Sequence, residues 1–352
     1  MTGEISPLRD LSVLVTCYNK LDSVDGFMTQ VLKLNKLGCQ IVIIDDGSDD
    51  GSTEKISRNV SELRNCKFVR QENQGSAAAR NRGILESDRK FIQFLDFDDF
   101  LNIELLQELF NTHQFSEDSL TFFEYTQLTK PEPFKYSLEK VPKILSKIEI
   151  EKELLERMGY WRIIYPRKIV TENNLRFIPT FQDLGGKRFI LDDLFWLIHI
   201  TAIGINCLKY NKEAVIYGYV KGENPLHDDG IDFSNQASLF PLATSTFISK
   251  LSDCDHPHNK DLLETILMRT LMFHARYIRA TNLAFYVKNV MGRSNNLEIR
   301  KSSISNEFFK IRLCSIAFFH SLKYTLRKLA LKDKRTTKIW QFFKTGKNSL
   351  SP

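Results

Sequence analysis

Asp96, Asp98 and Asp99 follow the apolar run 91–95 and bring three carboxylates close together. Side chains packed in this way repel one another unless a cation or solvent compensates their charge. Mg²⁺ and Mn²⁺ prefer oxygen ligands, and they commonly bind through one or two carboxylates together with phosphate oxygens of a substrate. The segment therefore indicates a site for Mn²⁺ or Mg²⁺, with an acidic turn or helix cap as the alternative.

A second acidic segment, 45–52, follows the apolar run that starts at Gln40. Asp, Gly and Ser dominate turns for conformational reasons, so a turn is the simplest interpretation. Because the segment follows an expected strand, one of its carboxylates is alternatively placed to accept a hydrogen bond from a nucleobase or ribose. Tyr18 follows another expected strand, and its ring would either pack in the core or stack on a nucleobase.

A third segment, 73–83, combines small residues with Arg80 and Arg82. Guanidinium groups bind phosphate through paired hydrogen bonds, and the start of a helix offers free N–H groups to an anion. The segment therefore favours either an anion-binding helix start or a closely packed helix with surface arginines.

Strands and helices are expected to alternate along the part of the chain that carries these segments. Runs rich in β-branched residues predict strands at 11–16, from 40 onward, at 67–71 and at 91–96. Apolar residues at helical spacing predict helices at 21–37, 53–63 and 75–85. Such alternation implies a parallel sheet with helices on both faces, and ligands of such sheets gather at the carboxyl ends of the strands. We therefore expect the polar clusters after the strands at one edge of the sheet.

Four segments in this order, 15–19, 44–50, 73–83 and 95–99, resemble the motifs of family 2 glycosyltransferases with the GT-A fold. The resemblance is strong over residues 10–102, looser over 158–222, and absent beyond about residue 235. It implies an α/β fold with a Rossmann-like, mainly parallel sheet flanked by helices. It also implies inverting transfer of a sugar from a nucleotide-diphosphate donor, most often a UDP-sugar, to a hydroxyl of a glycan or lipid-linked glycan in surface polysaccharide synthesis.

The resemblance assigns roles to individual side chains of this chain. It implies that the nucleotide sugar contacts Thr16, Tyr18, Asn19, Asp45, Asp46, Arg80, Asp96 and Asp98. It implies that the metal is bound by Asp99 and Asp98, with His227 near the diphosphate.

An acidic pair, Asp192 and Asp193, stands where the family usually has Glu-Asp before an apolar aromatic helix. The resemblance implies that Asp193, with Asp192 second, removes the proton of the acceptor hydroxyl. The alternative is that acidic residues simply favour the start of a helix. Trp161 lies in a segment that resembles the acceptor side of the family, where its ring would contact a sugar or pack in the core.

Two other classes of protein remain as alternatives. A nucleotidyltransferase also combines nucleotides, metal and acidic strand ends, but it would be expected to have a loop rich in glycine and lysine where this chain has 16–20. A catalytically inactive protein of the same fold, used for binding or as a scaffold, would not need the acidic residues at 98, 99 and 193.

Composition and patterning predict a catalytic domain and a helical appendage. The chain has 352 residues, of which 42% are hydrophobic and 26% charged, as in a globular protein with a sizeable core. We expect the GT-A domain at 1–232, with a nucleotide-sugar half at 10–102 and an acceptor half at 103–232. A helical region is expected at 233–352, and no oligomeric state is predicted.

The sequence also indicates a compartment. Six cysteines without a CxxC pair suggest neither a zinc site nor a disulfide framework, which fits a reducing compartment. Residues 1–10 do not have the pattern of a secretory signal, and the apolar stretch 194–208 is shorter than the roughly 20 residues of a membrane-spanning helix. We therefore expect a cytoplasmic protein.

Positive charge is concentrated at the C-terminal end, where Asp333 is the lone acid between 310 and 347. Aromatic and aliphatic residues alternate with the basic ones at 308–343, a composition that suits an anionic membrane surface. We therefore expect a peripheral contact with the inner face of the cell membrane, beside a lipid-linked acceptor. The alternative is a helix whose apolar face packs on the catalytic domain. Nucleic acid is not expected as a partner, because no recognised binding motif is present.

Overall fold

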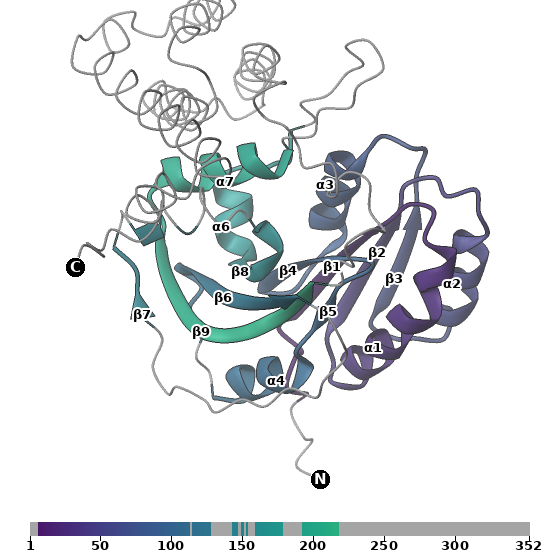
Figure 1. Cartoon of the computed structure of the whole chain (residues 1–352), viewed down its shortest axis with the longest axis horizontal. Coiled ribbons are helices and arrows are strands. Elements are labelled where there is room, and N and C mark those ends of the chain that lie inside the picture. The colour runs from purple at the N-terminus through teal and green to yellow at the C-terminus, as the bar shows by residue number, and fades with distance from the viewer. Residues whose placement is uncertain are drawn as a thin grey trace, which may run out of the picture. The chain divides into compact units, whose positions relative to one another are not determined.

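The computed structural model describes residues 6–112, 115–127, 143–146, 149–150, 153, 159–178 and 192–217 (Figure 1). The chain divides into two compact units, Met1–Gly230 and Ile231–Pro352, and every described residue belongs to the first unit. The expected boundary at residue 232 stays a prediction. The helical region expected at 233–352 lies outside the described residues, and so does His227.

The first half of the sheet is parallel, as the alternating pattern predicted. Its strands lie in the order β3-β2-β1-β4 and are β1 (Leu11–Cys17), β2 (Gln40–Asp45), β3 (Cys66–Arg70) and β4 (Phe91–Asp96). The connecting helices are α1 (Val24–Lys36), preceded by the 3-10 turn η1 (Leu21–Ser23), α2 (Ser52–Val60) and α3 (Ser76–Glu86). The expected strands and helices of this half are therefore confirmed to within a few residues.

The second half makes the sheet mixed. Its elements are β5 (Phe100–Leu101), α4 (Ile103–Asn111), β6 (Ser119–Gln127), β7 (Lys143–Ile144), η2 (Tyr160–Arg162), β8 (Ile163–Pro166), α6 (Arg167–Glu172), α7 (Asp192–Ile203) and β9 (Asn206–Tyr217). Strand β8 runs antiparallel to both β4 and β6, whereas β9 is parallel to β6 and antiparallel to β5 and β7. The run of consecutive parallel strands thus ends at β4, and beyond it parallel and antiparallel pairs are combined.

Two hydrophobic clusters cover the two faces of the sheet. Residues of α1, α2 and α4 pack on one face, and residues of α3, α6 and α7 pack on the other (Figure 1). Strands β1 and β2 are buried along almost their whole length, which explains their continuous apolar sequence rather than an alternating one. The faces of the sheet are therefore occupied by core side chains.

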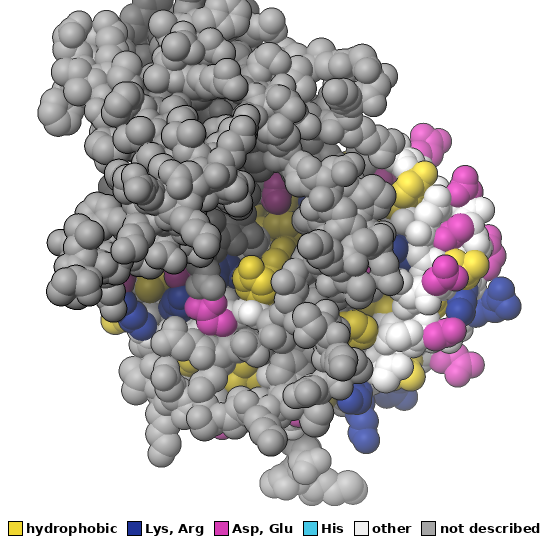
Figure 2. Space-filling model, viewed as in Figure 1, with side chains coloured by type: hydrophobic (Ala, Val, Ile, Leu, Met, Phe, Trp, Pro, Cys, Tyr) yellow, Lys and Arg dark blue, Asp and Glu magenta, His cyan; other side chains and the backbone are white. Residues whose placement is uncertain are grey.

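The outer faces of α1 and α2 carry acidic and basic side chains intermixed (Figure 2). Lys55 of α2 and Asp25 of α1 form an ion pair of 2.9 Å across the two helices.

Within the part of the chain that the structure describes, no helix has both the length and the apolar character needed to span a bilayer.

Candidate active site

The carboxyl ends of β1, β2 and β4 lie side by side. The strand registers pair Thr16 with Ile44 on one side and with Asp96 on the other. Thr16 is half-buried, and Tyr18, two residues further on, is exposed. The expected convergence of the polar clusters at one edge of the sheet is therefore seen in the structure.

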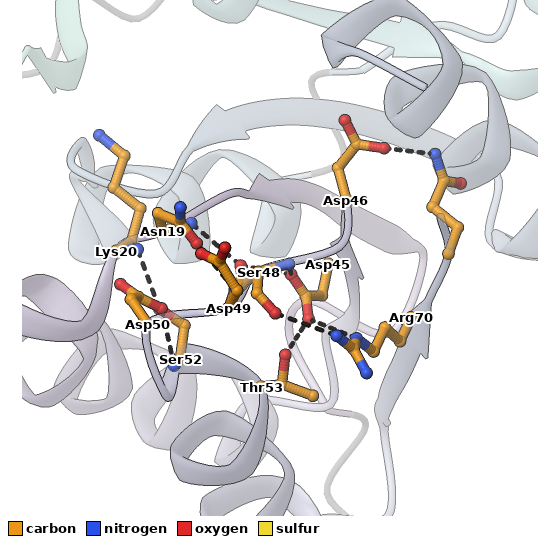
Figure 3. Close-up of polar contacts among 11 residues, drawn as sticks. Asn19, Lys20, Asp45, Asp46, Ser48, Asp49, Asp50, Ser52, Thr53 and Arg70 are labelled. Atoms are coloured by element: carbon orange, nitrogen blue, oxygen red, sulfur yellow. Dashed lines mark hydrogen bonds and ion pairs between the residues drawn. The ribbon is translucent and has the colours of Figure 1, made fainter. Parts of the chain in front are cut away.

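Asp45, the last residue of β2, is fully buried and holds its own turn together (Figure 3). Its carboxylate accepts hydrogen bonds from the Ser48 backbone N–H at 3.0 Å and the Ser48 hydroxyl at 2.5 Å, and from the Thr53 hydroxyl. The Arg70 Nε lies 3.7 Å away. This carboxylate supports the turn, and its expected contact with the donor stays a prediction.

The loop after β1 is tied to the loop after β2 by hydrogen bonds (Figure 3). Asn19 has a left-handed backbone with φ of 50°, and its N–H donates to the Ser48 hydroxyl at 3.0 Å. The Leu21 N–H donates to Asp50 at 3.0 Å. Burial acts to raise the pKa of Asp50, but hydrogen bonds from Ser52 and Leu21 lower this pKa below its usual value. Asn19 thus has a structural task in addition to its expected contact with the donor.

Asp46 points to the opposite side of the strand end and binds the segment that leads into α3 (Figure 3). Its Oδ1 accepts hydrogen bonds from the Gln71 side chain at 2.8 Å and from the Gln74 N–H at 2.9 Å. Its Oδ2 accepts one from the Gly75 N–H at 2.8 Å. The buried carboxylate therefore holds the two residues that lead into α3, Gln74 and the N-cap Gly75, from the end of a neighbouring strand.

Replacing Gly47 with alanine is expected to destabilise the protein by about 2 kcal/mol, because its φ of 79° is left-handed and a Cβ there would lie 2.9 Å from the Asn73 backbone nitrogen. Urea unfolding measures this free energy. Gly26→Ala in α1 is the matched control, since its Cβ would meet nothing within 4 Å and alanine favours a helix by about 1 kcal/mol. A Gly47→Ala protein as stable as the wild type would show that this turn tolerates a side chain.

Arg80 connects α3 to the start of α7. Its Nη1 lies 2.7 Å from Asp192 Oδ2, and its Nη2 lies 3.6 Å from Asp96 Oδ1. The Ser76 hydroxyl donates to the same Asp192 oxygen at 3.2 Å. Burial acts to lower the pKa of Arg80, but the carboxylates of Asp192 and Asp96 raise this pKa, so the guanidinium stays charged.

Asp193 follows Asp192 in the first turn of α7 and is half-buried, whereas Asp192 is only 3% exposed. The charge of Asp193 acts on the pKa values of both Arg80 and Tyr160, which puts it in the same cluster. Asp192 and Asp193, the two base candidates, thus belong to the cluster around Arg80 near the end of β4. Asp192 is in contact with Arg80 although 112 residues separate the two in the sequence.

The acidic loop after β4 has one exposed and one buried carboxylate beyond Asp96. Asp98 is exposed and forms an ion pair of 2.9 Å with Lys20, which follows β1. Asp99 is 1% exposed, and its carbonyl oxygen accepts a hydrogen bond of 2.8 Å from the Gln30 side chain. Of the two, Asp98 is therefore the carboxylate that faces solvent.

Residues 12–195 match the family described as glycosyl transferase family 2, over more than half of the chain. The chain belongs to glycosyl transferase family 2. This membership agrees with the resemblance of the four motifs, all of which lie within the matched residues.

Two curated relatives of the family are similar over short segments. The cholesterol galactosyltransferase of Borreliella burgdorferi is 28% identical over 101 residues, which are 29% of this chain and 28% of that protein. The poly-beta-1,6-N-acetyl-D-glucosamine synthase of Staphylococcus aureus is 35% identical over 95 residues, which are 27% of this chain and 23% of that protein. The matched part spans about a quarter of the length of these relatives.

The fold is shared with a solved structure. The crystal structure of S. aureus TarS 1–349 in complex with UDP-GlcNAc superposes with a TM-score of 0.55 at 13% identity, covering 90% of this chain and 91% of that chain. A crystal structure of S. aureus TarS that includes more of the protein gives a TM-score of 0.52, covering 82% of this chain and 55% of that chain. The predicted GT-A fold class is confirmed.

A divalent cation fits this site only if oxygens of a bound substrate complete its coordination. Among the described residues, no group of three His, Cys, Asp or Glu side chains could hold a metal ion. Mn²⁺ and Mg²⁺ nevertheless commonly use one or two carboxylates and take further oxygens from substrate phosphates. Asp98, exposed at the carboxyl edge of the sheet, suits that pattern, and Lys20 compensates its charge.

Trp161 lies in η2 and is half-buried. Its ring packs edge to face against Tyr125 with 5.0 Å between centroids, and its carbonyl oxygen accepts a hydrogen bond from the Gln93 side chain. The side chain also packs partly against both hydrophobic clusters. Both original interpretations remain, and the contact with an acceptor stays a prediction.

Sequence reasoning did not single out four side chains of this site: Ser76, Gln71, Tyr160 and Phe177. Ser76 lies within the motif at 73–83 directly after Gly75, and Gln71 lies two residues before that motif, so their positions could have marked them. Tyr160 lies in the acceptor-side segment next to Trp161 and Phe177 lies in no motif, and only the fold brings the two rings to Arg80.

Proposed function

We propose that this chain is an inverting glycosyltransferase that moves a sugar from a nucleotide-diphosphate donor to a hydroxyl of a glycan or lipid-linked glycan. The observation that carries the proposal is the pairing of Arg80 with an acid from each half of the site, Asp96 at the end of β4 and Asp192 at the start of α7. The Arg80 guanidinium thus connects the proposed donor region at the end of β4 to the start of α7, which carries the proposed base. Family membership supports the same reaction.

The donor half has the chemistry that a nucleotide needs. Tyr18 offers an exposed ring at the end of β1, and Asp46 offers acceptor oxygens at the end of β2. We assign the nucleobase and ribose to Thr16, Tyr18 and Asp46, and the sugar-diphosphate side to Arg80 and Asp98. Arginine suits the second task because its planar donors match phosphate oxygens.

A divalent cation at Asp98, with Asp99 beside it, would supply Lewis-acid stabilisation to the departing diphosphate. Asp98 is the exposed carboxylate of the loop and Asp99 the buried one, and both remain candidate ligands of the ion. Lys20 compensates the charge of Asp98 and would have to move aside for the ion.

Asp193 is the base of the proposed reaction. Oδ2 of Asp192 accepts hydrogen bonds from Arg80 and Ser76, so this carboxylate serves to hold the guanidinium. Asp193 takes the proton of the acceptor hydroxyl while the oxygen of that hydroxyl forms a bond to the anomeric carbon of the donor sugar. The bond from that carbon to the diphosphate oxygen breaks in the same step, and the nucleoside diphosphate leaves with the electron pair. A single displacement of this kind inverts the anomeric configuration.

A uridine donor is the default choice. The TarS structure that shares this fold was solved with UDP-GlcNAc, and one curated relative is named a poly-N-acetylglucosamine synthase. A hexosyl or N-acetylhexosaminyl transfer in surface polysaccharide synthesis would follow. Contact of the basic segment 308–343 with an anionic membrane remains a prediction, because that segment lies outside the described residues.

The proposal predicts release of nucleoside diphosphate from at least one nucleotide sugar in the presence of Mn²⁺ or Mg²⁺. A screen of UDP-, GDP- and TDP-sugars, with and without glycan acceptors, measures that release, and chelation with EDTA is expected to stop it. Proton NMR of the product reports the anomeric configuration. If none of the donors is consumed with either metal, an inactive binding protein replaces the enzyme, and retention of configuration would remove the single-displacement mechanism.

A further inference from the structure

The guanidinium of Arg80 lies in a corner formed by two aromatic rings. Its Cζ is 4.5 Å from the centroid of the Tyr160 ring and 5.3 Å from that of Phe177. The two rings meet edge to face at 5.3 Å, and Phe177 stacks on Trp196 at 4.2 Å with almost parallel planes. A cation over two aromatic faces is attracted by both, and this attraction strengthens when water is excluded. Only 12% of the Arg80 side chain is exposed.

Each wall of this corner is fixed by a hydrogen bond to its backbone. Asn81, the residue after Arg80, donates to the Phe177 carbonyl at 2.6 Å and accepts from the Phe177 N–H at 2.8 Å. The Tyr165 hydroxyl donates to the Tyr160 carbonyl at 2.8 Å. The rings are therefore held in place by groups other than Arg80, so they can position the arginine rather than merely follow it.

Tyr160 also takes part in the charge pattern through its hydroxyl. That hydroxyl donates to Asp96 Oδ1 at 3.0 Å, the same oxygen that lies 3.6 Å from Arg80 Nη2. Burial raises the pKa of Tyr160 well above its ordinary value, which keeps the hydroxyl protonated as a donor. One side chain thus contacts the cation with its ring and one of the two carboxylates with its hydroxyl.

We propose that Tyr160 is a positioning residue for sugar transfer, whose ring and hydroxyl hold the Arg80 guanidinium between Asp96 and Asp192. The inference rests on the proposed function for its kinetic consequence, but not for its geometry. Tyr160 acts through Arg80: it sets the place from which the guanidinium reaches both the donor region and the helix that carries the base. The ring provides most of the effect, since it covers the face of the cation.

Crystal structures of two variants test the geometry without turnover. In Tyr160→Phe the ring remains, so Arg80 is expected to keep its 2.7 Å contact with Asp192. In Tyr160→Leu the aromatic face is lost, and the guanidinium is expected to leave Asp192 for solvent. If Arg80 still contacts Asp192 in a folded Tyr160→Leu protein, the inference is wrong.

Kinetics of UDP release from UDP-GlcNAc test the role in the reaction. Tyr160→Leu is expected to lower kcat/KM by about 100-fold, as a small misplacement of a site residue does. Tyr160→Phe is expected to stay within about fivefold of the wild type, because it loses one hydrogen bond only. In an Arg80→Lys background, Tyr160→Leu should change kcat/KM by less than about twofold, since residues that act as a unit are not additive. Losses that multiply in the double variant would contradict an action through Arg80.

Tyr210→Leu is the matched control for loss of a buried tyrosine. Tyr210 lies in β9 with its ring stacked on Phe123 at 5.7 Å, and its replacement should lower the free energy of unfolding while leaving kcat/KM within about twofold of the wild type. A Tyr210→Leu protein that loses as much activity as Tyr160→Leu would mean that both act through stability. If the wild type consumes no nucleotide sugar, the proposed function fails, and the two variant structures alone decide the role of Tyr160.

Discussion

Asp193→Asn is expected to reduce kcat by about 10²- to 10⁴-fold, because asparagine cannot take the proton of the acceptor hydroxyl. The side chain keeps its size, so UDP binding and the melting temperature should stay close to those of the wild type. Steady-state release of UDP with and without acceptor, together with calorimetric titration of UDP, measures both quantities.

The matched control for this prediction is Asp25→Asn in α1, where the carboxylate is 79% exposed and pairs only with Lys55 in the contacts seen here. Neutralising that charge should leave kcat unchanged. An Asp193→Asn enzyme that transfers sugar at the wild-type rate would remove Asp193 as the base, and Asp192→Asn would then be the next variant to measure.

Arg80→Met is expected to lower the free energy of unfolding by about 3 kcal/mol and to stop transfer. Removing one partner of a buried ion pair leaves the other charge without compensation, which costs more than the pair itself contributes. Here the charge left behind is that of Asp192, which is 3% exposed, with Asp96 close by. Urea unfolding at neutral pH measures the free energy, and the donor assay measures the transfer.

Arg82→Met is the control on the same helix. Arg82 is half-exposed and pairs with Glu86 one helical turn away, an arrangement that contributes about 0.5 kcal/mol or less. If both arginine variants lose the same stability, the contact between Arg80 and Asp192 is no stronger than a surface pair, and the bridge between the two halves of the site would lose its support.

The first half of the fold could be predicted because each of its elements has a strong local signal. The runs 13–15 and 41–44 at the centres of β1 and β2 are continuously apolar, since helices cover both faces of the strands. Gly38, with φ of 81°, follows Leu37, the C-cap of α1, at a position where a glycine ends a helix without strain. The coincidence of polar residues with strand ends then placed Thr16, Asp46 and Asp96 at one edge.

The second half could not be predicted at the same level. Strand β9 has neighbours on both sides, and its pairing with β6 contains register shifts between Phe122 and Tyr125. Such irregularities depend on tertiary packing and leave no periodic signal in the sequence. The mixed character of the sheet beyond β4 was therefore outside the reach of pattern reasoning.

Partners distant in sequence explain the remaining differences at the site. Arg80 was assigned to the donor, but its shortest ion pair is with Asp192, a residue from the other half of the chain. Asp45 was grouped with the ligand contacts; in the structure it is buried and accepts hydrogen bonds within its own turn, and its contact with the donor stays a prediction. Spacing identifies which residues gather at an edge, but not which of them neutralise one another.

The carboxylate of Asp46 has two roles, and both affect any mutational study of donor preference. It is expected at the nucleobase, and it also binds the backbone N–H groups of Gln74 and Gly75, the two residues that lead into the helix that carries Arg80. Truncating Asp46 would therefore loosen the guanidinium as well as the base contact, and a weaker affinity for UDP would combine both losses. Comparing uridine with UDP on the same variant separates them, since only the diphosphate form reports on the arginine.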